Sequence, residues 1–305
     1  MFNFRLQVEH PITEYITGID LVHQMLRVAK GHQLKHTQND IQIRGWAVES
    51  RVYAENPYKN FGLPSVGRLT RYQEPLNIPN VRCDSGVQEG SDISIYYDPM
   101  ICKLISYGDS RDQALNTMGQ ALDNYVIRGL THNIPLLRDI LTEPNFVSGK
   151  LSTNYLPMVY TDGFKGRHLT KESEQALVAI ASAMFLRYHA RSKSFTNTQS
   201  VELGSSSKFS STDLFVDLSE NQSTSSDQLI RAQVTLDNET FKIKVDDFEV
   251  QLPNNISLAA MTLDFSINGK TKTVQLISLD GDGRLQIQFE GTIVSTLLLL
   301  SLTGN

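Results

Sequence analysis

Short alternating segments from Leu229 onward constrain the fold of this 305-residue chain more than any other feature. Segments such as IRAQVTL, TFKIKV, FEVQL, TVQLISL and RLQIQFEG alternate apolar and polar residues, as half-buried strands do. Turn-forming pairs separate several of these segments, namely Asp237-Asn238, Asn268-Gly269 and Asp282-Gly283. Short strands at such regular spacing predict an antiparallel β-barrel or sandwich.

The residues that flank this β region are of three kinds. KESEQALVAIASAMFLRYHARS (171–192) predicts one amphipathic helix ahead of the strands. Residues 191–228 are rich in Ser, Thr and Asn and have weak periodicity, so we expect a mobile loop or an edge there. The leucine run in GTIVSTLLLLSLTGN (291–305) fits poorly as a final barrel strand, and we expect an aberrant C-terminal segment.

The N-terminal half mixes helices and strands, so the fold class is α+β. Residues 18–31 predict a helix that Asp20 caps, and residues 43–55 predict a strand. DSRDQALNTMGQALDNYVI (109–127) predicts a helix that opens with a capping box, and NIPLLRDIL (133–141) a shorter one.

Composition excludes several classes of protein. The net charge is −5 at pH 7, without the basic surplus that nucleic-acid binding requires, so we expect no nucleic-acid partner. Cys83 and Cys102 are too few for a disulfide framework and form no zinc-binding pair, which favours a reducing compartment. The C-terminal leucine run is much shorter than the roughly 20 residues that span a bilayer, so we expect no membrane association.

The segment NFRLQVEHP (3–11) combines an apolar row with a polar one. In an extended strand successive side chains point to opposite faces, and Pro11 predicts that such a strand ends near His10. One face would then be apolar and the other polar, with Phe2, Phe4, Leu6 and Val8 on the first and Asn3, Arg5, Gln7 and Glu9 on the second.

The polar row has two interpretations. It can be the solvated face of an edge strand, which is the more common situation. It can also be a site for a small anion that must lose a proton. Arg5 then supplies a planar cation, Gln7 donates a hydrogen bond and Glu9 acts as base.

Longer stretches decide between these interpretations. RLQVEHPITE resembles the biotin carboxylase signature of biotin-dependent carboxylases. The stretches GWAVESRVYAENPYKNFGLPSVGRL, SDISIYYDPMICKLISYG and LDNYVIRGLTHNIPLLRDIL are similar to the C-terminal part of the same domain. YTDGFKG and YVIRGLTHN favour the enzymes that act on propionyl-CoA over those for methylcrotonyl-CoA, acetyl-CoA or pyruvate.

The resemblance implies roles around bicarbonate. Members of the family use ATP and bicarbonate to carboxylate biotin on a ring nitrogen. Glu9 matches the residue that deprotonates bicarbonate. The groups that match the family's bicarbonate-binding set are Arg5, Gln7 and the backbone at Val8.

The resemblance also implies groups for biotin and a metal. Arg51 matches the arginine that stabilises the enolate form of biotin, although an Arg beside Glu49 is as often half of a simple ion pair. Asn3 matches a ligand of the Mg²⁺ or Mn²⁺ ion held between the nucleotide phosphates, and such hard cations prefer oxygen ligands. Lys103, on an alternating segment, is expected to be solvated.

We expect four segments. Residues 1–42 end an ATP-grasp domain and 43–152 form the biotin carboxylase C-terminal domain. Residues 153–170 are a linker, and 171–305 form an incomplete helix-plus-β-barrel domain that contacts a carboxyltransferase β subunit. Most of the ATP-grasp region and the biotin carrier domain have no counterpart, so we expect a chain truncated at both ends and inactive alone.

Three functions compete. The chain can belong to a ligase subunit that works with the β subunit and a biotin carrier domain in a hetero-oligomer. It can be a non-catalytic module that binds the β subunit, or the equivalent subunit of another acyl-CoA carboxylase. The resemblance implies the mitochondrial matrix as the location.

Overall fold

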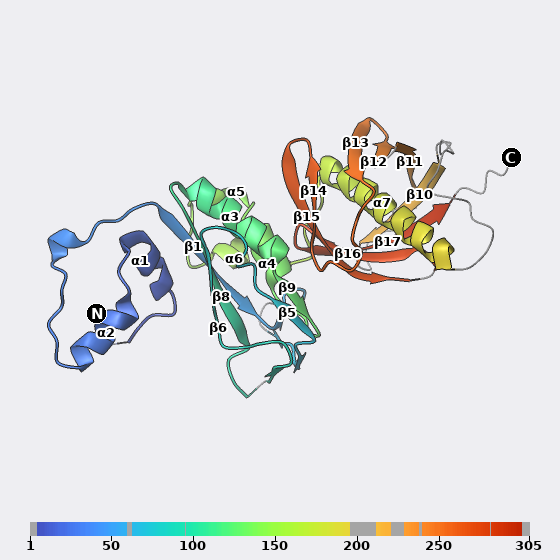
Figure 1. Cartoon of the computed structure of the whole chain (residues 1–305). Coiled ribbons are helices and arrows are strands. Elements are labelled where there is room, and N and C mark those ends of the chain that lie inside the picture. The colour runs from blue at the N-terminus through green and yellow to red at the C-terminus, as the bar shows by residue number, and fades with distance from the viewer. Residues whose placement is uncertain are drawn as a thin grey trace. The chain divides into compact units, whose positions relative to one another are not determined.

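The structure is a computed structural model, and it describes residues 5–59, 63–94, 96–195, 212–220, 229–237, 240–280 and 282–300. The chain divides into two compact units, residues 1–166 and 167–305. The units are described separately below, and Figure 1 labels their elements.

In its described residues, unit 1 contains short helices and four small groups of paired strands. Its helical elements are α1 (His10–Thr17), α2 (Leu21–Ala29), the 3₁₀ helix η1 (Gln38–Asp40), α3 (Arg111–Asn124), α4 (Ile134–Ile140), α5 (Pro144–Val147) and α6 (Tyr155–Val159). Its strands are β1 (Trp46–Tyr53), β2 (Glu55–Asn56), β3 (Leu63–Pro64), β4 (Gly67–Arg68), β5 (Arg71–Gln73), β6 (Val81–Ser85), β7 (Asp92–Ile93), β8 (Met100–Gly108) and β9 (Val126–Arg128).

An antiparallel sheet in the order β1-β8-β6 organises unit 1. Helix α3 lies beside this sheet (Figure 1), and its buried Met118 joins the core with Val52 and Leu104. Because side chains alternate along a strand, the neighbours of these residues point to the opposite face, which α1 approaches. That second face carries the candidate site.

The predicted helices at 18–31, 109–127 and 133–141 are confirmed. Asp20 accepts a hydrogen bond from the His23 N–H at 2.7 Å, and Ser110 accepts one from the Gln113 N–H at 3.2 Å. The reciprocal arm of the capping box differs, because the Gln113 side chain accepts from the Asp109 N–H rather than from Ser110. Pro135 lies in the first turn of α4, where a missing N–H costs nothing.

The predicted strand at residues 3–9 is wrong for the residues that the structure describes. Residues 5–9 form a bend and a turn, and α1 begins immediately afterwards at His10. Pro11 opens this helix rather than ending a strand, since its fixed φ suits the first turn. The exposed strand edge that such a strand would create is therefore absent at residues 5–9.

Unit 2 is one long helix with an eight-stranded antiparallel sheet. Its elements are α7 (Lys171–Phe195), β10 (Thr212–Glu220), β11 (Ile230–Asp237), β12 (Thr240–Val245), β13 (Phe248–Pro253), β14 (Leu263–Ile267), β15 (Lys270–Leu279), β16 (Arg284–Phe289) and β17 (Thr292–Leu300). The order is β13-β12-β11-β10-β17-β16-β15-β14, which is two meanders joined where β10 pairs with β17. The end strands β13 and β14 contact each other, so the sheet is a nearly closed barrel, as predicted.

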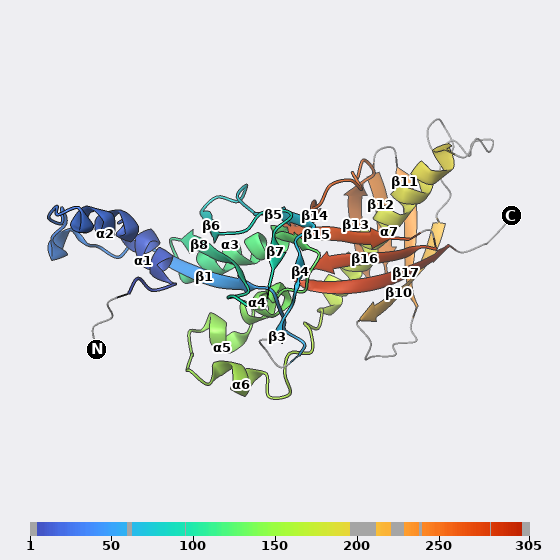
Figure 2. The same ribbon diagram turned by 90° about the horizontal axis from the view of Figure 1, so that it is seen from below.

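Helix α7 crosses the strands of the sheet in both ribbon views (Figures 1 and 2), and it contacts strands of both meanders, among them β12 and β16. The consecutive residues Leu177, Val178 and Ala179 are all fully buried, as are Ile180 and Ala181. Five consecutive helical residues point in all directions around the axis, so this stretch is buried on every side. The predicted helix is present, but its amphipathic character is wrong here because the sheet surrounds it.

The central pair of strands corrects two predictions. Residues 212–220, expected in a loop or edge, form the interior strand β10, while 196–211 and 221–228 lie outside the described residues. The leucine run, expected to be aberrant, forms β17, and its Val294 and Leu298 enter the core. A strand between two partners in a closed sheet tolerates polar and long apolar runs alike, because pairing and burial decide its conformation.

Candidate functional site

Glu9 and Arg51 form an ion pair on the second face of the β1-β8-β6 sheet. Arg51 Nη2 donates to Glu9 Oε2 at 2.9 Å across 42 residues of sequence. Arg51 lies in the middle of β1, and Glu9 is the residue immediately before α1. The Glu9 side chain is half exposed and that of Arg51 is 41% exposed, so solutes can reach both.

Lys103 lies opposite Arg51 on β8. Its Nζ is 3.4 Å from the Val8 carbonyl oxygen, to which it donates, and 3.3 Å from Asp84 Oδ2 on β6. The side chain is only 13% exposed, so the expectation that Lys103 is solvated is wrong. It links the sheet to the backbone just before Glu9.

The charged row continues to α1 through Arg82. This guanidinium binds Asp84 through two hydrogen bonds, at 2.7 and 2.9 Å, and Glu14 Oε2 at 2.7 Å. Burial acts to raise the pKa of Asp84, but hydrogen bonds and charge from Arg82 and Lys103 together hold that pKa below its ordinary value. Glu14 also accepts from the Leu21 N–H, which ties α1 to the start of α2.

An open cleft of about 650 Å³ borders this end of the row. Glu14, Asp20 and Arg82 line it together with Tyr15 and Val22. Each charged group among them has a partner inside the protein, so the cleft walls are stabilised internally.

Glu49 lies beneath Arg51 on the same strand. Its side chain is 6% exposed, and its Oε1 is 3.5 Å from Arg51 Nε. Its Oε2 is buried and has no hydrogen-bond partner among the described residues. Burial raises the pKa of Glu49, and the nearby Lys103 and Arg51 reduce that rise.

The structure thus brings together three of the residues singled out from sequence: Glu9, Val8 and Arg51. Arg5 and Gln7 lie exposed in the segment just before them, where the Gln7 carbonyl accepts from the His10 N–H. Asn3 lies outside the described residues.

Sequence reasoning missed Lys103, Asp84, Arg82 and Glu14 as members of this network. The alternation of VRCDS and MICKLISYG places Arg82, Asp84 and Lys103 on strands, whereas Glu14 lies in α1. It does not reveal that these strands are neighbours, and that pairing is what joins the charges.

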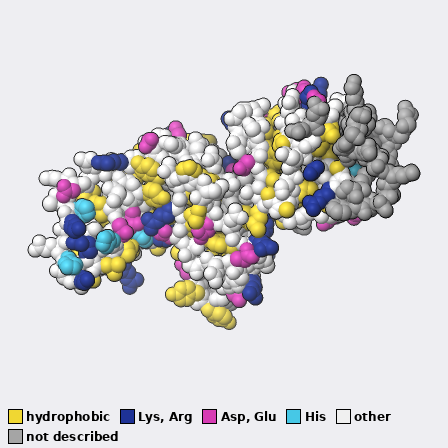
Figure 3. Space-filling model, in the orientation of Figure 1, with side chains coloured by type: hydrophobic (Ala, Val, Ile, Leu, Met, Phe, Trp, Pro, Cys, Tyr) yellow, Lys and Arg dark blue, Asp and Glu magenta, His cyan; other side chains and the backbone are white. Residues whose placement is uncertain are grey.

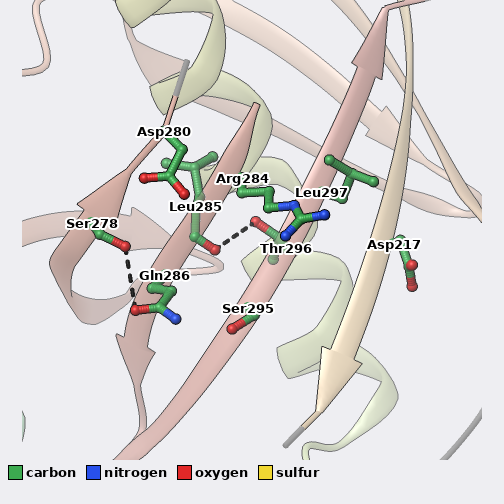
Figure 4. A pocket seen from close by; sticks show the side chains of 9 residues that line it. All are labelled: Asp217, Ser278, Asp280, Arg284, Leu285, Gln286, Ser295, Thr296 and Leu297. Atoms are coloured by element: carbon green, nitrogen blue, oxygen red, sulfur yellow. Dashed lines mark hydrogen bonds between the residues drawn. The ribbon is translucent and has the colours of Figure 1, made fainter. Parts of the chain in front are cut away.

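A second hollow, of about 380 Å³, lies on the outside of the unit 2 barrel (Figure 4). Arg284 lies between Asp280 and Asp217 in this view, and the Ser278 hydroxyl donates to Gln286 Oε1 at 3.3 Å. The hollow is polar and open, and it crosses β15, β16, β17 and β10.

The described residues lack two further kinds of feature. They contain no group of three or more His, Cys, Asp and Glu side chains that could hold a metal ion. No helix in the same part of the chain is long and apolar enough to cross a membrane.

On the face drawn in Figure 3, basic and histidine side chains gather over the part that carries α1 and α2. Helix α2 itself exposes Val22, Met25, Leu26 and Val28. An exposed apolar helix face of this kind is typical of a surface that packs against further protein.

Domain models match nearly the whole chain. Residues 49–158 match the biotin carboxylase C-terminal domain, and residues 177–301 match the propionyl-coenzyme A carboxylase BT domain. Residues 1–37 match the carbamoyl-phosphate synthase L chain ATP binding domain. The chain belongs to the family of biotin-dependent carboxylases.

Within that family the chain is similar over nearly its full length to propionyl-CoA carboxylase α chains. The mitochondrial α chain of Rattus norvegicus is 48% identical over 302 residues, which are 99% of this chain and 40% of that protein. The mitochondrial α chain of Homo sapiens is 49% identical over the same length, again 99% of this chain and 40% of the relative. This chain therefore spans about two fifths of the length of these relatives.

Other matches cover a smaller share. A crystal structure of the biotin carboxylase subunit of pyruvate carboxylase is 40% identical and has a TM-score of 0.49. The match covers 51% of this chain and 34% of the chain in that structure.

Proposed function

We propose that this chain belongs to the biotin carboxylase subunit of a propionyl-CoA carboxylase. That enzyme uses ATP and bicarbonate to carboxylate biotin. The carboxyl group is then transferred from biotin to propionyl-CoA, which gives methylmalonyl-CoA. Similarity to the propionyl-CoA carboxylase α chains over 99% of this chain supports the proposal.

The ion pair of Glu9 and Arg51 carries the proposal at the level of residues. A half-exposed carboxylate 2.9 Å from a fixed guanidinium combines a base with a cation in one place. In this proposal Glu9 removes the proton of bicarbonate. Arg5, Gln7 and the Val8 backbone bind the anion, and Arg51 stabilises the negative charge on the biotin enolate.

The proposed cofactors are biotin, ATP and Mg²⁺ or Mn²⁺. Bound biotin supplies the ring nitrogen that accepts the carboxyl group. The side chains around Arg51 and Lys103 suit an anionic group, since both cations are within a few ångströms of the Val8–Glu9 segment. For the metal we propose Asn3, and the described residues supply no donor cluster through which a metal step can be assigned.

The proposed partners are a carboxyltransferase β subunit and a biotin carrier domain in a hetero-oligomer, with neither nucleic acid nor membrane as a partner. The BT domain match over residues 177–301 supports the β subunit as partner. We place the protein in the mitochondrial matrix, because the curated relatives are named as mitochondrial.

Isolation of the native polypeptide tests the function. An antibody against residues 109–125 is used to immunoprecipitate the protein from its source tissue, and intact mass is measured beside an avidin blot. We expect a species larger than 34.2 kDa that binds avidin and fixes labelled bicarbonate only with ATP and propionyl-CoA. A species of 34.2 kDa without biotin and without fixation contradicts the proposal.

A pair of variants tests the assignment of Glu9. In that native protein, Glu9→Gln should lower bicarbonate-dependent ADP release by about 10²- to 10⁴-fold, the usual contribution of a general base. Glu55→Gln is the matched control, since Glu55 is a partly buried carboxylate on the neighbouring strand β2. The chain of residues 1–305 alone should release no ADP with free biotin, and measurable release refutes that expectation.

A second candidate function is docking of the β subunit without catalysis, which the BT domain match favours. Sedimentation velocity of purified β subunit with residues 1–305 should show a complex, and residues 1–166 should show none. Binding by residues 1–166 alone would assign the contact to unit 1 and contradict this function for the barrel.

A further inference from the structure

A buried carboxylate lies directly under the candidate site without an evident role in stability. Glu49 is 6% exposed, and one of its oxygens has no hydrogen-bond partner among the described residues. Burying an incompletely paired charge is costly, and an apolar residue of similar size would stabilise a sheet at least as well. The contact that Glu49 does make is with Arg51 Nε, at 3.5 Å.

Two carboxylates therefore contact different nitrogens of one guanidinium. Glu49 approaches Arg51 at Nε, and Glu9 accepts from Nη2. Because a guanidinium is planar and its donors form a rigid fork, two such contacts fix the orientation of its plane.

Lys103 holds the second component of the site, the backbone turn that carries Glu9. It is opposite Arg51 in register, and two cations facing each other on neighbouring strands repel. Asp84 on one side and Glu49 on the other offset this repulsion. The ammonium group also donates to the Val8 carbonyl oxygen, and so holds the backbone that presents Glu9.

We propose that Glu49 and Lys103 are positioning residues of the carboxylation site. Glu49 orients the guanidinium of Arg51, and Lys103 holds the turn that carries Glu9. Neither residue touches the reacting atoms. The inference rests on the proposed function for its purpose, but the geometry can be measured without catalysis.

The test of Glu49 is hydrogen exchange at the Nε–H of Arg51, measured by NMR on residues 1–305 labelled with ¹⁵N-arginine. Arg51→Lys assigns the signal by its disappearance. In Glu49→Ala the exchange rate should rise about fivefold, the upper range for loss of one partly exposed ion-pair contact, which Glu49 makes to Nε at 3.5 Å. In Glu49→Gln, which keeps the shape of the side chain and removes its charge, the rise should be about twofold to threefold.

Glu55→Ala is the control for Glu49 and should leave the Arg51 signal unchanged. If Glu49→Ala does not fold, Glu49→Gln carries the test. An Arg51 exchange rate that is the same in folded Glu49→Gln and in the unsubstituted protein overturns the role of Glu49. If the Arg51 exchange rate changes in the Glu49 variants but the native protein does not fix bicarbonate, the positioning role of Glu49 is supported and the proposed function is rejected.

The test of Lys103 is the exchange of the His10 amide, whose N–H donates to the Gln7 carbonyl oxygen at 3.1 Å within the turn that Lys103 holds. Lys103→Met keeps the apolar stem and removes the charge, and it should raise this exchange about tenfold. Lys103→Arg should restore most of the protection. Lys59→Met, at an exposed position, is the control. Unchanged protection of the His10 amide in Lys103→Met overturns the role of Lys103.

Discussion

Replacing Ala179 by Leu tests whether the barrel encloses α7 on every side. Ala179 is fully buried, on the side of the helix that carries its smallest side chains. An isobutyl group in place of a methyl group must displace packed neighbours, which costs about 1–3 kcal/mol of unfolding free energy. Ala190→Leu, at a half-exposed position on the same helix, should change it by no more than about 0.5 kcal/mol.

Urea denaturation of residues 1–305 measures this effect with an internal control. Trp46 is the only tryptophan of the chain and lies in unit 1, so its fluorescence reports that unit. Far-UV circular dichroism reports the secondary structure of both units, so a transition that Trp46 fluorescence does not follow belongs to unit 2. With a slope near 2 kcal/mol/M, Ala179→Leu should lower the unit 2 midpoint by about 1 M and leave the Trp46 transition in place. Equal unit 2 midpoints for Ala179→Leu and Ala190→Leu would refute the enclosure of the helix.

Three further predictions concern stability and association. Burial, with a smaller effect of Arg128, lowers the pKa of His132 to about 4. Unfolded His132 titrates near 6.5, so the folded protein binds fewer protons between these values, and unit 1 should lose about 3 kcal/mol as pH falls from 6.5 to 4. His132→Gln should remove that loss, and an unchanged pH dependence of the Trp46 transition would contradict it. Leu298→Ala, in the β17 core, should cost about 2–5 kcal/mol, whereas Leu299→Ala, at a residue 45% exposed, should cost under about 0.5 kcal/mol, and equal midpoints would reject the register of β17. Leu26→Glu places a charge on the exposed apolar face of α2 and should therefore raise the monomer fraction in sedimentation velocity. An unchanged monomer fraction would contradict self-association of the chain through that face.

Local signals in the sequence predicted the helices α2, α3 and α4 and the turn at Asn268-Gly269 correctly. Asp20 and Ser110 mark helix starts because their side chains satisfy N–H groups that the helix leaves unpaired. The Asn268-Gly269 pair has positive φ at both residues, as a two-residue hairpin turn requires. These outcomes depend on residues within a few positions of one another.

Local signals misled where a distant partner decides the conformation. Alternation at residues 3–9 suggested a strand, but a strand needs a neighbour, and Pro11 instead starts a helix. Helix α7 can carry apolar residues on all its sides because the barrel encloses it and buries them. Weak periodicity concealed β10, since its strand character comes from pairing on both edges.

The candidate site divides in the same way. The sequence by itself determined which groups could perform the chemistry, because Glu9 and Arg51 lie in motifs that resemble the family's signature. Only the tertiary structure decided that these two side chains meet at 2.9 Å, that Lys103 reaches the Val8 carbonyl across 95 residues of chain, and that Glu49 is buried beneath them. A motif constrains residue types and local backbone, whereas distances between remote side chains follow from strand order and register, which no short stretch of sequence encodes.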